Sequence, residues 1–432
     1  MRVWSKALVG GVAIALAVSG CAGSSGDSPS TSSQAPSGPR EITVWLMNGS
    51  APKGLLDSLN KEFESTHKDV KVKYEEQQWN GIQDKLTTAL ASNDAPDLIE
   101  IGNTQAPKFA SEGVLEDVTA DADSFNGANW LPSLKDSGSW DGKQYAVPFY
   151  AANREVLYRK DLFEKAGITT PPKSRQEWLD AITKLKAANA SDPEFQALYL
   201  PGQNWYTLAS FIWDEGGDIA KKDGTKFTAS LSTPEAKAGL EFYKQLVDAS
   251  GTKAPKDADE QTPEQAGIYA QGHVAMMIAL PWEVATAAKS DPSIKDKTSA
   301  FPIPSKTAGK TAPVFQGGSD LAIPANSKDK DLAKDYLKLI TSDKYQAEFA
   351  KAGMIPGTSK DVSALEADPV NAAMAAASKN GHALPATPGW ATVEAGQNPL
   401  KDMLTAYLTG AKQIDAATKD ADDALNKAFS GS

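Results

Sequence analysis

Apolar and amphipathic stretches alternate along the chain after residue 40, and their spacing predicts both strands and helices. The runs 42–46 and 97–101 are largely apolar, as in strands buried on both faces of a sheet, and the run 70–74 alternates apolar with polar residues. In the segment after each run, which begins near Ser50, Trp79 or Asn103, we expect a helix that buries one apolar face. This β-α-β-α-β-α order predicts a mainly parallel sheet covered on both faces by helices.

The carboxyl ends of these strands are the expected place for a ligand, because open α/β sheets bind ligands beyond that edge. Asn48, Trp79 and Asn103 each fall in a connection that follows a predicted strand. We therefore expect these three side chains to face a binding site.

The rest of the chain continues the mixture of strands and helices, with no internal repeat. We expect strands at 143–147 and 155–159, extended segments at 274–280 and 321–324, helices at 174–189, 207–214 and 233–248, a short helix from Asp161 and a largely helical tail from Lys328. At 432 residues with 41% hydrophobic content, the chain is too long for one ordinary core, which favours two lobes.

The first twenty residues are typical of a bacterial export signal. Arg2 and Lys6 give a positive start, and the uncharged run 7–18 is too short for a membrane span, which needs roughly 20 apolar residues. The signal ends in Val18-Ser19-Gly20-Cys21, which resembles the lipobox of bacterial lipoproteins. We expect lipid on Cys21, which would become the mature N-terminus. As Cys21 is the only cysteine, its place after the apolar run argues against a buried structural role.

A flexible tether is expected at 21–39, because thirteen of the eighteen residues from 22 to 39 are Ser, Gly or Pro. Such a coil has a root-mean-square reach of roughly 20 to 25 Å. Without residues 1–20 the chain keeps 42 basic and 55 acidic side chains, a balance of −13. That balance argues against nucleic acid as a partner, since phosphate binding needs clustered cations.

Several motifs together resemble the carbohydrate-type extracellular solute-binding proteins, the family of the maltodextrin-binding protein. The order and spacing of these motifs match that family from about residue 41 to residue 430. The motifs are Asp94-Ala95-Pro96-Asp97-Leu98-Ile99, Phe109-Ala110-Ser111-Glu112-Gly113-Val114-Leu115, Val156-Leu157-Tyr158-Arg159-Lys160-Asp161-Leu162-Phe163, Pro281-Trp282, and Asp320-Leu321-Ala322-Ile323-Pro324 ahead of Leu332-Ala333-Lys334-Asp335-Tyr336-Leu337.

The resemblance implies an α/β, two-lobed, periplasmic-binding-protein-like fold with mostly parallel sheets and a ligand cleft between the lobes. One lobe would take residues 40–148 and 302–343, and the other would take 149–301 and 344–432. The protein would bind a sugar, a di- or oligosaccharide, at the outer face of the cell membrane and deliver it to the permease of an ABC importer. We expect a monomer with no catalytic activity and no cofactor, held at the membrane through Cys21.

Aromatic side chains are the first requirement of a sugar site, because a saccharide has flat apolar faces rimmed by hydroxyls. The resemblance assigns stacking roles to Trp282, to Trp390 in the turn-rich Thr387-Pro388-Gly389-Trp390, and to the pair Trp205-Tyr206. A packing role is the alternative for each of them. Trp178, inside a predicted amphipathic helix, is expected in the core.

Polar candidates lie on loops after strands or at chain crossings. The expected hydrogen-bonding residues are Asn48, Asn103, Thr104 and Asn153, together with Gln316-Gly317-Gly318, where missing side chains would let backbone approach a ligand. An asparagine at a turn can instead serve backbone conformation, and the glycine pair can be an ordinary flexible loop. Thr104 and Gln105 stand where the maltodextrin-type pattern has charged residues, which points away from maltose itself.

Two rival functions remain open from the sequence, and a third is disfavoured. A peptide- or polyamine-binding protein would share the fold, and a buried cluster of Asp and Glu in the cleft would favour polyamine. A secreted glycoside hydrolase would need two carboxylates flanking the scissile bond. The chain has 55 acidic residues, so the sequence alone does not exclude such a pair. A metal site is disfavoured, because none of His67, His273 and His382 is spaced as a ligand pair.

Overall fold

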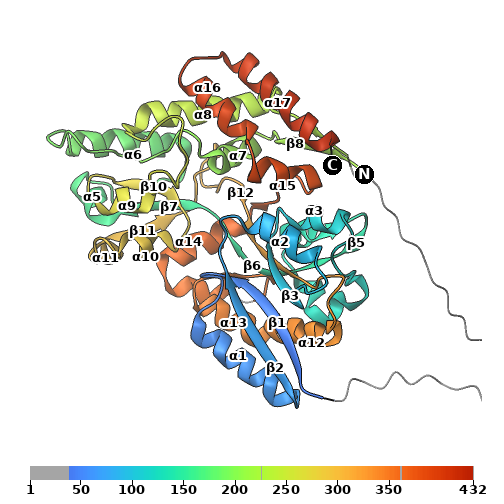
Figure 1. Cartoon of the computed structure of the whole chain (residues 1–432). Coiled ribbons are helices and arrows are strands. Elements are labelled where there is room, and N and C mark those ends of the chain that lie inside the picture. The colour runs from blue at the N-terminus through green and yellow to red at the C-terminus, as the bar shows by residue number, and fades with distance from the viewer. Residues whose placement is uncertain (1–37, 225, 361, 432) are drawn as a thin grey trace, which may run out of the picture. The chain divides into compact units, whose positions relative to one another are not determined.

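The computed structural model describes residues 38–224, 226–360 and 362–431, and the described residues from Arg40 onward form one compact unit (Figure 1). The predicted lipid site at Cys21 lies outside the described residues. Among the residues that are described, no helix is long and apolar enough to cross a membrane.

A six-stranded sheet with the order β14-β6-β13-β3-β1-β2 forms the core of the first lobe. Its opening strands β1 (Arg40–Met47), β2 (Val70–Gln77) and β3 (Leu98–Gly102) are parallel, with β1 between the other two. Helices α1 (Lys53–Thr66) and α2 (Ile82–Leu90) make the crossovers. The predicted β-α-β-α-β order is therefore confirmed.

The other half of this sheet is antiparallel. Strands β6 (Ala146–Ala152) and β14 (Ile355–Pro356) flank β13 (Gly317–Ala322) on one side, and β13 pairs with β3 on its other side. The chain returns from the second lobe to this sheet as β13, which is antiparallel to β3. β13 thus brings a distant part of the sequence to the carboxyl ends of β1 and β3.

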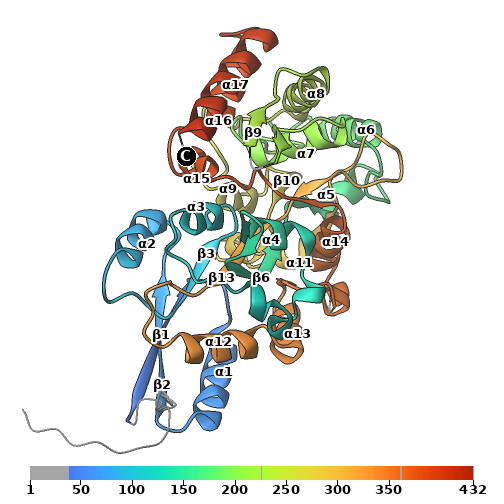
Figure 2. The same ribbon diagram turned by 90° about the vertical axis from the view of Figure 1, so that its right-hand side faces the viewer.

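Helices cover both faces of the sheet because successive strand residues point to opposite sides. Leu98 faces a cluster that includes Phe63 of α1 and Tyr336 of α12 (Lys330–Ile340). Ile99 faces a second cluster that includes Phe109 of α3 (Ala106–Ser111). Figure 2 shows α2 on the opposite side of the strands from α1 and α12.

The second lobe is built on an antiparallel sheet with the order β10-β7-β11, formed by Met276–Ala279, Glu155–Arg159 and Thr298–Phe301. Helices α6 (Arg175–Ala188) and α7 (Trp205–Asp214) belong to its core, which contains fully buried Trp178 as predicted. Ser174 begins α6 by accepting the N–H of Glu177, the pattern of a helix N-cap.

The remaining helices and strands complete the two lobes. They are α4 (Pro132–Ser137), β4 (Ser139–Trp140), β5 (Lys143–Gln144), α5 (Lys160–Lys165), β8 (Ala220–Asp223), β9 (Lys226–Ala229), α8 (Pro234–Ser250), α9 (Gln265–Ala270), α10 (Glu283–Ala287), α11 (Ile294–Lys297), β12 (Val314–Phe315), α13 (Asp343–Lys351), α14 (Pro369–Ser378), β15 (Gly381–His382), α15 (Pro388–Ala395), α16 (Pro399–Leu408) and α17 (Ile414–Ser430). Short 3₁₀ helices span Thr119–Phe125, Gly127–Asn129 and Val362–Ala367.

The chain crosses between the two sheets from β6 to β7, from β11 to β13, and after β14. The predicted lobe boundaries at 148 and 343 stay a prediction, although β6 runs on to Ala152 and β14 adds Ile355 and Pro356 to the six-stranded sheet.

Buried Glu100 fixes the carboxyl ends of the strands that face the second lobe. One of its oxygens accepts the N–H of Met47 at 2.7 Å, and the other accepts the hydroxyls of Ser50, at 2.7 Å, and Ser319. A fully buried carboxylate needs such partners, because leaving it without them is strongly unfavourable. Glu100 therefore ties β1, β3 and β13 together at one edge of the sheet.

Candidate ligand-binding cleft

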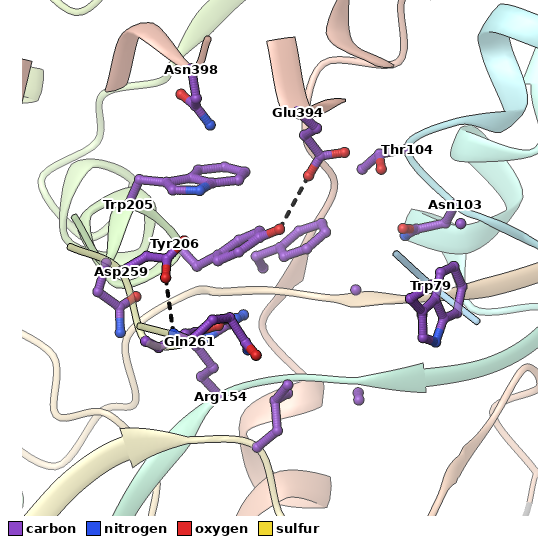
Figure 3. A pocket seen from close by; sticks show the side chains of 18 of the residues that line it. Trp79, Asn103, Thr104, Arg154, Trp205, Tyr206, Asp259, Gln261, Glu394 and Asn398 are labelled. Atoms are coloured by element: carbon purple, nitrogen blue, oxygen red, sulfur yellow. Dashed lines mark hydrogen bonds and ion pairs between the residues drawn. The ribbon is translucent and has the colours of Figure 1, made fainter. Parts of the chain in front are cut away.

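A cavity of about 460 Å³ lies at this edge, with walls from both lobes. That volume falls within the range of small-molecule sites, roughly 300–1,000 Å³. The structure brings together there the predicted site residues Trp79, Asn103, Thr104, Trp205, Tyr206, Trp282, Gly317 and Gly318. Figure 3 shows the first five of them.

A stack of aromatic rings forms the wall on the second lobe. The ring centroids of Trp205 and Tyr206 are 3.8 Å apart, and Tyr206 lies nearly parallel to Phe315 at 5.3 Å. The stack sits at the start of α7, where the side chain of Asn204 accepts the N–H of Thr207 and so fixes the beginning of the helix. The position of these rings is thus set by a capped helix rather than by a loose loop.

Trp79 and Trp282 are the two most exposed large hydrophobic side chains among the described residues, at 42% and 49%. Both line the cleft, Trp79 from the connection between β2 and α2, and Trp282 from the turn between β10 and α10. Exposed apolar surface is unfavourable by roughly 25 cal/mol per Å², so its concentration at a cleft is typical of a binding surface.

The structure corrects the expectation for Trp390, which is fully buried and does not line the cleft. Its ring packs behind Trp205, with centroids 5.9 Å apart, and against Phe429 of α17. The sequence Thr387-Pro388-Gly389, predicted to be a turn, instead begins helix α15. Pro388 lies in the first turn of this helix, where its missing N–H is tolerated.

Three polar candidates also lie away from the cleft lining. Asn48 is exposed and donates to Glu76 at 2.7 Å. Asn153 and Gln316 are buried near the crossings, where Asn153 donates to the carbonyl of Met374 at 3.3 Å and Gln316 accepts the hydroxyl of Ser133. The side chains of Asn153 and Gln316 point inward because they pack against α14 and α4.

Asn103 and the glycine pair line the cleft and also hold strands together. The backbone N–H of Asn103 donates to Gly318, and its side-chain amide donates to the carbonyl of Gln316 at 3.1 Å. Gly318 has φ +149°, and a Cβ there would lie 2.1 Å from the carbonyl oxygen of Tyr150. Glycine is therefore required for β13 to pass β6, independently of any ligand.

Charged residues in the cleft were missed by the sequence reading. Arg154 is held by Glu260 through two hydrogen bonds, one of them 3.0 Å from Nε to Oε2, and its guanidinium lies 4.0 Å from the centre of the Tyr206 ring. Lys401 pairs with Asp259 at 2.6 Å. The partners of each pair are more than 100 positions apart in the chain, so no local pattern could have revealed them.

Two further carboxyl groups have raised pKa values. Burial, with the nearby charge of Glu260, raises the pKa of Glu283 to about 7, although Glu283 accepts hydrogen bonds from Gln265 and from the Leu280 N–H. Burial also raises the pKa of Glu394, whose Oε1 accepts the hydroxyl of Tyr206 at 3.3 Å. Among the described residues, no group of three or more His, Cys, Asp or Glu side chains is arranged to hold a metal ion.

Two α/β lobes that enclose an aromatic cleft define the architecture of a solute-binding protein. Residues 48–347 match the family described as bacterial extracellular solute-binding protein. The chain belongs to this family.

Relatives and solved structures agree with that assignment. The chain is 42% identical over 422 residues to the diacetylchitobiose binding protein DasA of Streptomyces coelicolor, which covers 98% of this chain and 97% of that protein. The sugar-binding protein MalE of Xanthomonas citri superposes with a TM-score of 0.78 at 21% identity, over 90% of this chain and 98% of that one. The GacH receptor of Streptomyces glaucescens gives 0.76 at 24% identity, over 91% and 99%.

Trp390 and Trp282 form a matched pair for separating core from cleft. Trp390→Ala should lower the free energy of unfolding without ligand by about 3–5 kcal/mol, because it empties a fully buried site. Trp282→Ala should change it by less than about 0.5 kcal/mol, since the ring is half exposed. Urea denaturation of the two variants measures both values, and equal losses would contradict the two placements.

Proposed function

We propose that the protein captures a sugar in the cleft and delivers it to the permease of an ABC importer. The observation that carries this is the set of aromatic rings around one cavity: exposed Trp79 from the first lobe, and exposed Trp282 with the Trp205-Tyr206 stack from the second. Aromatic faces bind the C–H faces of a saccharide, and the polar groups between them suit its hydroxyls. The protein acts by binding alone and catalyses no reaction.

Within the sugars, an N-acetylated hexosamine disaccharide is the proposed ligand. The 42% identical relative is a diacetylchitobiose binding protein, and the alignment spans nearly all of both chains. An N-acetyl group presents an amide and a methyl, and the cleft lining offers both the amide of Gln261 and the apolar side chain of Leu280.

The charges of the cleft favour a neutral ligand over a polyamine. Glu260 is neutralised by Arg154, and Asp259 by Lys401. Glu394 accepts the hydroxyl of Tyr206. A polyamine site would need carboxylates free to meet the ammonium groups of the ligand. These ion pairs and hydrogen bonds of the cleft carboxylates also disfavour a glycosidase. Such an enzyme needs one carboxyl group free to donate a proton and another free to attack.

The membrane anchor and the location are also proposals. The lipobox-like sequence before Cys21 supports a lipid-anchored protein at the outer face of the cell membrane, working as a monomer. The Ser-, Gly- and Pro-rich segment after Cys21 would give the folded body freedom to reach the permease.

A thermal-shift panel tests the ligand class. Diacetylchitobiose at 100 times its Kd should stabilise the protein by about 2.7 kcal/mol, and its deacetylated form and maltose should act only at much higher concentration. Spermidine should have no effect at the same concentrations. Stabilisation by spermidine with no response to any saccharide would contradict the sugar assignment.

Replacing Cys21 tests the anchor separately. Cys21→Ser should move the protein from the detergent-soluble membrane fraction to the medium or the soluble fraction, because the only thiol that could take lipid is lost. Fractionation with immunoblotting measures the change. Retention of the variant in the lipoprotein fraction would show that the anchor lies elsewhere.

A further inference from the structure

Two segments of the second lobe that line the cleft are joined by one buried amide. The first segment is 259–261, which precedes α9, and the second is the turn 280–282 between β10 and α10. Gln265, the first residue of α9, is fully buried, and its backbone N–H donates to the carbonyl of Glu260 at 3.0 Å. Its backbone therefore holds the first segment, and its side chain can hold the second.

The side-chain amide of Gln265 contacts both ends of that turn. Its Nε2 donates to the carbonyl of Ile278 in β10 at 3.1 Å and to Oε2 of Glu283, the first residue of α10, at 2.9 Å. Both partners are acceptors, so only the NH₂ end of the amide can face them. One side chain thus joins the strand before the turn to the helix after it.

Glu283 closes the turn through two further hydrogen bonds. Its Oε1 accepts the backbone N–H of Leu280 at 2.9 Å, and its own backbone N–H donates to the carbonyl of Leu280 at 3.0 Å. Hydrogen bonds to an ionised carboxylate are stronger than those between neutral groups. The backbone from 280 to 283 is therefore held in one conformation by bonds between its own two ends.

The ring of Trp282 depends on this turn for its position. The side chain is 49% exposed, so other residues pack against only part of its surface. Trp205 and Tyr206, by contrast, hold each other by stacking. The backbone that carries Trp282 therefore decides where its ring stands in the cleft.

We propose that Gln265 and Glu283 are a pair of positioning residues that hold the ring of Trp282 in place for a sugar face. Neither of the two side chains lines the cleft, so the pair acts through the backbone of the turn and not by contact with the ligand. Its effect on affinity rests on the proposed sugar-binding function, whereas its effect on the position of the ring does not.

A double-mutant cycle between Glu283 and Trp282 tests the pair, with diacetylchitobiose as the probe in isothermal titration at about pH 8.5. Glu283 is ionised there, because burial raises its pKa only to about 7. Trp282→Ala should weaken binding at least about thirtyfold, as for an aromatic hot spot. Glu283→Gln should weaken it about fivefold, because the new NH₂ group would face the NH₂ of Gln265. In the double variant Glu283→Gln should add less than about twofold, since the ring that it positions is gone.

Two further variants complete this experiment. Gln265→Met keeps the length of the side chain without its donors, and it should match the loss of Glu283→Gln. Glu235→Gln is the control, because it removes an exposed carboxylate in the first turn of α8, outside the cleft lining, and should leave affinity unchanged. Losses at positions 282 and 283 that multiply to about 150-fold, or unchanged affinity of Glu283→Gln, would overturn the positioning role.

Indole ¹⁵N–¹H spectra without sugar separate failure of the pair from failure of the sugar assignment. The Trp282 signal, identified by its loss in Trp282→Ala, should shift or broaden in Gln265→Met and in Glu283→Gln. The signal of Trp178, which is fully buried, should stay in place. If the wild-type chain binds no saccharide, the sugar assignment fails and these spectra decide on the pair. An unmoved Trp282 signal in both variants would then overturn it. Glu283 is only partly buried, so Glu283→Gln keeps the test valid if Gln265→Met fails to fold.

Discussion

The hydrogen bonds of buried Glu100 are the constraint on which the rest of the cleft depends. They join the ends of β1 and β3 to β13, a strand that comes back from the second lobe. Because β13 can pass β6 closely only with glycine at 318, its route is fixed within narrow limits. Asn103 and Thr104 lie at this edge of the sheet and line the cleft. The edge therefore determines the position of the cleft wall that the first lobe forms.

The second wall depends on a different kind of interaction. Tyr206 is held by stacking on Trp205, by the guanidinium of Arg154 and by the carboxylate of Glu394. Buried ion pairs such as Arg154–Glu260 contribute little net stability, but removal of one partner leaves an uncompensated charge. Arg154 lies between β6 and β7, where the chain crosses to the second lobe. Its contact with the ring of Tyr206 therefore links that ring to the crossing segment.

Periodicity was enough to predict the parallel strands, and the family resemblance implied the two lobes and the aromatic residues Trp205, Tyr206 and Trp282, which line the cavity. Trp282 could be placed from the resemblance of Pro281-Trp282 to the proline-tryptophan loop of the family. Trp390 could not, because a proline begins a helix as readily as it makes a turn. The inward rotation of Asn153 and Gln316 depends on helices that pack against the crossings from elsewhere in the chain. The same holds for the ion pairs of Arg154 and Lys401, whose partners are distant in sequence.

Tryptophan indole ¹⁵N–¹H resonances would show most directly whether a sugar binds between the two walls. During titration with diacetylchitobiose, the signals of Trp79, Trp282 and Trp205 should shift together and saturate at one Kd. The signal of Trp178, which is fully buried in the second lobe, should stay in place. Unchanged signals from all three cleft tryptophans at saturating sugar would contradict binding in this cleft.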